Sequence, residues 1–219
     1  MRKLILSLVL CASIAFAAPI YTSVTLESAG TLANGSISPY SLFINYAGQD
    51  FQTLCIDSAD SVYVGETWNA DLFSFTSLAT ESVYWKSNPN YQTDYLEDLY
   101  LFTQATSPFV TPTQQTNIQY TAWNIFNPGS APTNSATATY LAQAESAVSL
   151  GLPGINLANY WLVESPSGQE SPTGGPAQAF IVQFANNQKL NPTPEPSTFA
   201  YIGCSLIGLG MLWRKRHIA

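Results

Sequence analysis

One thiol in the body of the sequence could take part in chemistry. Cys11 and Cys204 lie in apolar segments at the two ends of the chain, so Cys55 is the only cysteine between those segments. It has no partner there for an internal disulfide. In an oxidising compartment such a thiol pairs with another molecule or oxidises, unless burial or another bond protects it. In the alternating segment Thr-Leu-Cys-Ile-Asp it can equally be a small buried hydrophobe.

A predicted helix over residues 112–127 carries a glutamine and a tryptophan that bear on this thiol. Thr111 is placed to cap the helix and Pro112 lies in its first turn. Gln119 and Trp123 are four residues apart and therefore share a helix face. The sequence thus offers a strand cysteine followed by Gln-x-x-x-Trp on a helix.

This arrangement resembles the bacterial surface thioester domains over roughly residues 51–126. Leu54-Cys55-Ile56 fits the first part of their pattern, whereas Thr121 and Ala122 stand where those domains usually have Ala and Ile. The resemblance implies that the Cys55 sulfur and the Gln119 side-chain carbonyl join with loss of ammonia, beside Trp123. A thioester of this kind needs oriented donors that polarise the amide carbonyl. It also needs shielding from water, which favours an aromatic wall such as Trp123 or Tyr120.

Other catalytic and metal-binding chemistries have little support. The only histidine, His217, lies at the C-terminal end, which excludes a histidine triad or a histidine zinc site in the body of the protein. Asp57, Asp60 and Glu66 lack the ligand order of a calcium loop, so we expect a solvated acidic turn there. Glu97 and Asp98 are expected to be surface charges on a helix. We predict no metal and no cofactor.

The ends of the chain predict export and sorting. Arg2 and Lys3, an apolar stretch and Ala-Phe-Ala form a signal peptide, residues 1–17, that signal peptidase would cut after Ala17. The C-terminal 28 residues or so resemble a PEP-CTERM sorting signal of Gram-negative bacteria that make exopolysaccharide. The signal would begin with a linker at 186–196 that contains Pro194, Glu195 and Pro196. An apolar transmembrane helix at 197–213 would follow. A basic cytoplasmic tail at 214–219, with Arg214, Lys215 and Arg216, would end the chain.

The resemblance implies a transient tether rather than a permanent anchor. The uncharged run from Phe199 to Trp213 is shorter than the roughly 20 residues that a bilayer core requires. In PEP-CTERM proteins such a helix holds the chain in the inner membrane until the exosortase cleaves near the motif. The expected final location is the cell envelope or extracellular surface.

The exported region, residues 18–185, should form one acidic α+β domain. Between the two cleavage sites, from residue 18 to about residue 193, the chain holds two lysines, Lys86 and Lys189, and thirteen acids, which gives 2 − 13 = −11, so we expect no nucleic-acid partner. Alternating strands are predicted at 21–26, 40–46, 51–57 and 61–68, helices at 91–105, 112–127 and 135–150, and strands at 159–165 and 177–184. This order predicts an antiparallel sheet or sandwich with a helical insertion.

Three functions fit these observations. The first is a non-catalytic binding or structural module, not an enzyme, deposited at the surface or in exopolysaccharide. The second adds covalent attachment to surface amines or hydroxyls through Cys55 and Gln119. The third is a glycan-active hydrolase, which would need two carboxylates about 5 to 9.5 Å apart in a cleft lined by aromatic residues.

The sorting hypothesis predicts the ends of the mature protein. In a host with an exosortase, the mature chain should begin near Ala18 and end between Pro194 and Thr198, and deletion of Arg214 to Arg216 should impair its retention for processing. Intact-mass measurement on envelope fractions tests this. A mature species that still carries Trp213 would leave a simple membrane anchor instead.

Overall fold

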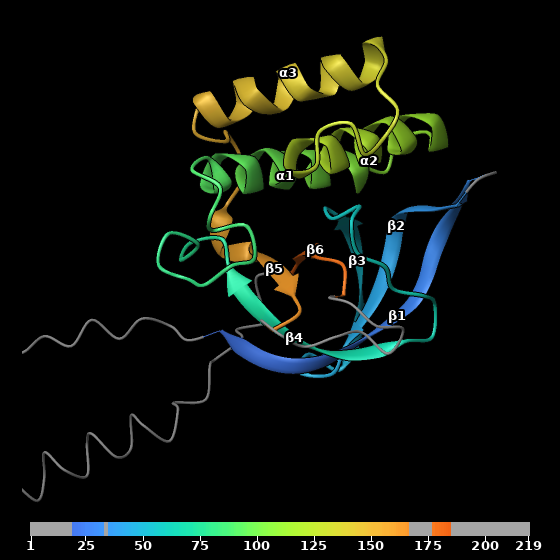
Figure 1. The fold of residues 1–219 in the computed structure, drawn as a ribbon, viewed down its shortest axis with the longest axis vertical. Helices are drawn as coiled ribbons and strands as arrows, with labels where there is room; N and C mark the ends of the chain where they lie inside the picture. The colour runs from blue at the N-terminus through green and yellow to red at the C-terminus, as the bar shows by residue number, and fades with distance from the viewer. Residues whose placement is uncertain (1–18, 33–34, 167–176, 185–219) are drawn as a thin grey trace, which may run out of the picture.

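The computed structural model in Figure 1 describes residues 19–32, 35–166 and 177–184, which form a six-stranded barrel covered on one side by three helices. The strands are β1 (Ile20–Leu32), β2 (Gly35–Ile44), β3 (Gln49–Cys55), β4 (Thr67–Ser74), β5 (Tyr160–Glu164) and β6 (Phe180–Gln183). The predicted signal peptide, linker, transmembrane helix and basic tail lie outside the described residues. Among the described helices, none has the length and apolar character needed to span a bilayer.

The α+β class and the antiparallel pairing are confirmed, but the sheet is a closed barrel and not an open sheet or sandwich. Its strand order is β1-β2-β3-β6-β5-β4, and β4 pairs with β1 to close it. The long strand β1 makes this possible, because it pairs with β2 on one side and with β4 on the other. Register shifts between Leu26 and Ser28 and between Ala29 and Gly30 are irregularities of the kind that bend a strand around a barrel.

The strand predicted at 61–68 is wrong over most of its length, because β4 begins only at Thr67. The preceding residues form a turn in which Gly65 has φ +90°, a backbone conformation that side-chain-bearing residues rarely adopt. Glu66 closes the turn by accepting a hydrogen bond from the Tyr63 amide at 2.8 Å. The alternating pattern of this segment therefore reflects a turn that leads into the strand.

The three predicted helices are confirmed as α1 (Tyr91–Ala105), α2 (Pro112–Phe126) and α3 (Ser135–Ser149). Helix α2 begins with a reciprocal capping box between Thr111 and Gln114, as its Thr-Pro start predicts. Helix α3 ends in a Schellman motif: the Gly151 amide donates to the Val148 carbonyl, and the Leu152 amide donates to the Ala147 carbonyl. These end signals are local, which is why the sequence located the helices well.

The helices form two layers over the barrel. Helices α1 and α2 lie against it and α3 covers them from outside, as Figure 1 shows. Side chains of β3 separate two apolar cores: Cys55 belongs to the barrel interior, whereas Leu54 and Ile56 pack with the helices. This alternation follows from the two-residue period of a strand.

Several acids predicted to be solvated are buried instead. Asp98 is fully buried, Glu97 is 9% exposed and Asp57 is 2% exposed. Burial disfavours the charged carboxylate and, together with neighbouring acids, raises the pKa of Glu97 to about 7 and that of Asp98 well above its usual value. Sequence spacing placed Glu97 and Asp98 correctly on α1 but did not show that α1 packs against both α2 and α3.

A buried hydrogen bond joins α1 to the barrel. The Tyr95 hydroxyl donates to one carboxyl oxygen of Glu164, and the Tyr84 amide donates to the other at 2.9 Å. Burial raises the pKa of Glu164 to about 7, partly offset by these two hydrogen bonds. The contact ties the helical layer to β5.

This buried acid predicts that the protein is more stable in mild acid than in mild base. The native pKa of Glu164 lies above its unfolded value, so the stabilisation is complete below about pH 4.5 and is lost as pH rises through about 7. The full change for this group is about 3 kcal/mol. Urea unfolding of the full-length chain at pH 5 and pH 8 measures it. Glu164→Gln should flatten the pH dependence, and an equally steep dependence in that variant would contradict the assignment.

Candidate functional site

The candidate site lies where β3 ends beneath α2. Cys55 is the last residue of β3 and pairs with Phe180 of β6. Its side chain is fully buried and faces the barrel interior. The strand therefore fixes the backbone of Cys55 at the rim of the barrel, where a helix can reach it.

Helix α2 brings Gln119 to this point. Gln119 is fully buried, and its side-chain amide nitrogen donates a hydrogen bond to the backbone carbonyl of Cys55. The two residues are 64 positions apart, so this contact is made by the tertiary fold and not by local chain geometry. The expectation that Cys55 and Gln119 are neighbours is confirmed.

Trp123, one turn further along α2, contacts the sulfur itself. Its indole N–H donates to Cys55 Sγ at 3.5 Å, within the range for a weak hydrogen bond to sulfur. The ring of Tyr120 lies beside the indole, with ring centroids 6.0 Å apart. The three motif residues Cys55, Gln119 and Trp123 thus meet in one place: Gln119 donates to the Cys55 carbonyl and Trp123 to the Cys55 sulfur.

The thiol is protonated in this environment. Cys55 Sγ donates to the backbone carbonyl of Asp57 at 3.0 Å. Burial raises the pKa of the Cys55 thiol to about 12, and the hydrogen bonds from Trp123 and to Asp57 only partly offset that rise. A nucleophilic attack by Cys55 must therefore begin from the thiol and release its proton during the reaction.

A small acidic hole lies next to the site. Its lining consists of Asp57, Asp60, Tyr84, Glu164, Ser165, Ala177 and Ala179, and its free volume is about 10 Å³. Burial raises the pKa of Asp60 to about 7, with further contributions from a hydrogen bond to Asp57 and from its charge. The hole has room for about one water molecule. In the part of the chain that the structure describes, no group of three or more acids, cysteines or histidines is arranged to hold a metal ion.

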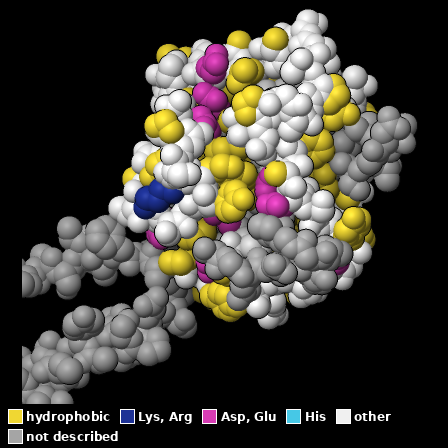
Figure 2. All heavy atoms as spheres, in the orientation of Figure 1, with side chains coloured by type: hydrophobic (Ala, Val, Ile, Leu, Met, Phe, Trp, Pro, Cys, Tyr) yellow, Lys and Arg dark blue, Asp and Glu magenta, His cyan; other side chains and the backbone are white. Residues whose placement is uncertain are grey.

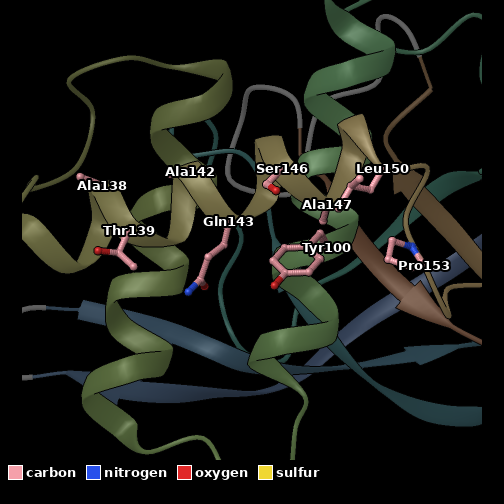
Figure 3. Close-up of a pocket in the computed structure, with 9 residues that line it drawn as sticks. All are labelled: Tyr100, Ala138, Thr139, Ala142, Gln143, Ser146, Ala147, Leu150 and Pro153. Atoms are coloured by element: carbon pink, nitrogen blue, oxygen red, sulfur yellow. The ribbon is translucent and has the colours of Figure 1, made fainter.

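The other depressions on the molecule offer little chemistry. Figure 3 shows a shallow groove of about 670 Å³ along α3, with Tyr100 contributed by α1. Its lining is mostly small or apolar, with only hydroxyl and amide groups from Tyr100, Thr139, Gln143 and Ser146. It shares no residue with the Cys55 site. The groove therefore contributes nothing to the reactivity of Cys55.

The surface carries few positive charges. Within the described ranges Lys86 is the only lysine or arginine, and it donates to the backbone carbonyl of Glu81. Figure 2 accordingly shows scattered acidic side chains and a single basic one on the face it presents. The described part of the protein therefore offers few amines that could attack an internal electrophile.

Comparison of the chain with protein-family models, with curated proteins and with solved structures finds no match. The sequence pattern had identified Cys55, Gln119 and Trp123. It had not identified Asp98 as a buried residue, because a single carboxylate on a helix carries no signal of burial.

Proposed function

We propose that this chain is an exported envelope protein whose domain forms an internal thioester between Cys55 and Gln119 and then attaches covalently to a partner. The observation that carries the proposal is the Gln119 amide, fully buried and bonded to the backbone of the only cysteine in the described residues. The Trp123 N–H on the Cys55 sulfur supports it independently.

Thioester formation would use the groups that meet at Cys55. The Cys55 sulfur forms a bond to Cδ of Gln119, the amide C–N bond breaks, and the thiol proton leaves with the nitrogen as ammonia. The Cys55 carbonyl holds the departing NH₂ group. Trp123 N–H already donates to the sulfur, and in the proposed reaction it would turn to the Gln119 carbonyl oxygen as that oxygen gains negative charge.

Burial supplies what the product needs. Cys55 and Gln119 are both fully buried, so bulk water is kept from the thioester. The ester is then an electrophile for an amine or hydroxyl on a partner, such as a surface amine or an exopolysaccharide hydroxyl. Each domain would form one bond and not turn over, so the chain acts as an adhesive module rather than as an enzyme.

The predicted sorting signal would place this chemistry outside the cell. Signal peptidase and then the exosortase would process the chain during its passage through the inner membrane, and the domain would be released to the envelope or matrix. The rival hydrolase function gains no support from the acidic hole at Asp57, Asp60 and Glu164, because this hole is too small for a sugar ring. The other rival is a passive surface module in which Cys55 is buried and free. The next experiment distinguishes this module from the thioester.

Tryptic peptides of the full-length chain test the thioester directly. No lysine or arginine other than Lys86 lies between Cys55 and Gln119, so cleavage after Lys86 separates the two residues. We expect the two peptides to remain joined in wild type, with a combined mass lower by one ammonia, and to separate after methylamine treatment. Mass spectrometry of freshly folded protein provides both readings.

The matched controls are Cys55→Ser and Gln119→Ala, each expected to give separate peptides and to take up no methylamine. A wild-type Cys55 that is free and alkylates on unfolding, with unlinked peptides, would refute the thioester and leave the passive surface module.

Trp123 should control how fast the bond forms. Trp123→Phe keeps an aromatic wall but removes the N–H donor, and loss of one such donor costs roughly a hundredfold in rate. Its neighbour Tyr120 serves as the control, because Tyr120→Phe removes a hydroxyl but keeps the ring beside the Trp123 indole, and within the described site it is Trp123 that donates to the Cys55 sulfur. Time-resolved intact mass after cell-free synthesis measures both rates. Equal rates in the two variants would exclude a donor role for Trp123.

A further inference from the structure

We propose that Asp98 is the proton-transfer residue for thioester formation, taking the thiol proton of Cys55 and giving a proton to the departing nitrogen of Gln119. This inference rests on the proposed function. It starts from a buried carboxyl group that packing alone does not explain.

Asp98 lies at the centre of the buried side of α1. Tyr95 and Phe102 flank it on one side of the helix, and Leu101 and Ala105 on the other, and all of them are buried. Asp98 is itself fully buried, and neither carboxyl oxygen has a hydrogen-bond partner among the described residues. Buried polar atoms without partners are rare in folded proteins and are costly for stability, so this position is unusual.

The packing of α1 against α2 places Asp98 near the reacting groups. The two helices run antiparallel, because the Tyr95 ring packs on Phe126 with centroids 4.8 Å apart and Gln115 donates to the Ala105 carbonyl at 3.4 Å. This register puts Asp98 level with Trp123. Gln119 then lies one helical turn away along the axis, about 6 Å.

The contacts between α1 and β3 also indicate that Asp98 lies near Cys55. Helix α1 touches β3 as well as α2, so its buried side faces the strand that ends at Cys55. Asp98 also lies close enough for its charge to contribute to the raised pKa of the Cys55 thiol, after the larger effects of burial and of Asp57. The other acids that act on Asp98 are Glu97 and Asp94 of its own helix, while Glu145 of α3 acts on Glu97.

A neutral carboxyl group has the properties that the reaction requires. Burial, followed by the charges of Glu97 and Asp94, raises the pKa of Asp98 well above its usual value and so favours the neutral carboxyl form. Its acidic oxygen can donate while its carbonyl oxygen accepts. The thiol, whose own pKa is about 12, needs such an acceptor for its proton.

The proton balance closes without another reactant. As the bond from Cys55 Sγ to Gln119 Cδ forms, the thiol proton passes to one Asp98 oxygen. The proton on the other Asp98 oxygen passes to the Gln119 nitrogen as the C–N bond breaks, so ammonia leaves and Asp98 ends neutral. The transfer proceeds after rotation of the Asp98 side chain or through one water molecule.

The test compares the rate of ammonia loss with thermal stability in the full-length chain. Asp98→Asn keeps the shape and removes the exchangeable acid proton, and Asp98→Leu is a second variant that fills the same site with an apolar group. Acid-quenched intact mass after cell-free synthesis gives the rate. We expect both variants to form the thioester at least about tenfold more slowly, while Asp98→Leu raises the melting temperature by roughly 2 to 4 °C.

Glu164→Gln is the matched control, because it removes another buried acid, one that hydrogen bonds already satisfy, and should leave the rate unchanged. Wild-type rates in both Asp98 variants would overturn the role of Asp98 and leave the thioester intact. Slow variants that also melt at lower temperature would make the loss structural and overturn the proposal. A wild-type chain that never loses ammonia would refute the thioester, and the Asp98 role with it.

Discussion

The bond from the Gln119 amide to the Cys55 carbonyl is the contact on which the arrangement of helix and barrel at the site depends. A strand end and a helix face are both fully buried here, so each polar group must find its partner inside the protein. Leaving a buried carbonyl or amide unpaired would cost about 1–3 kcal/mol. This requirement fixes the position of α2 along the rim of the barrel and so determines which residue of α2 meets the sulfur.

The requirement that buried polar groups find partners also applies to the buried acids, because the protein has few positive charges to pair with them. For Glu164, hydrogen bonds from the Tyr95 hydroxyl and the Tyr84 amide offset the cost of burying the carboxyl group. Asp98 has no such partner in the described structure. Because local rules of stability are most often broken where function requires it, the contrast between these two buried carboxyl groups directs attention to Asp98.

The surroundings of Cys55 both shield the thiol from solvent and supply the groups that the proposed reaction uses. Burial suppresses the thiolate and keeps solvent away, which would make a lone cysteine inert. In the proposed reaction, the Gln119 amide, the Trp123 indole and the Asp98 carboxyl group together offer a route that does not pass through a free thiolate. In the proposed function, the low lysine content around the site protects an electrophile that must survive until a partner arrives.

The sequence alone determined the local features of this protein. Helix ends follow from Thr111, Pro112 and Gly151, whose backbone preferences act over a few residues, and the alternation around Cys55 assigned its side chain to the opposite side from Leu54 and Ile56. The family-like spacing also selected Gln119 and Trp123. The closure of the sheet, the turn before β4 and the burial of Asp57 and Asp98 depended on contacts between segments far apart in the chain. Those contacts are set by packing of whole layers, and a residue's own neighbours in sequence do not encode them.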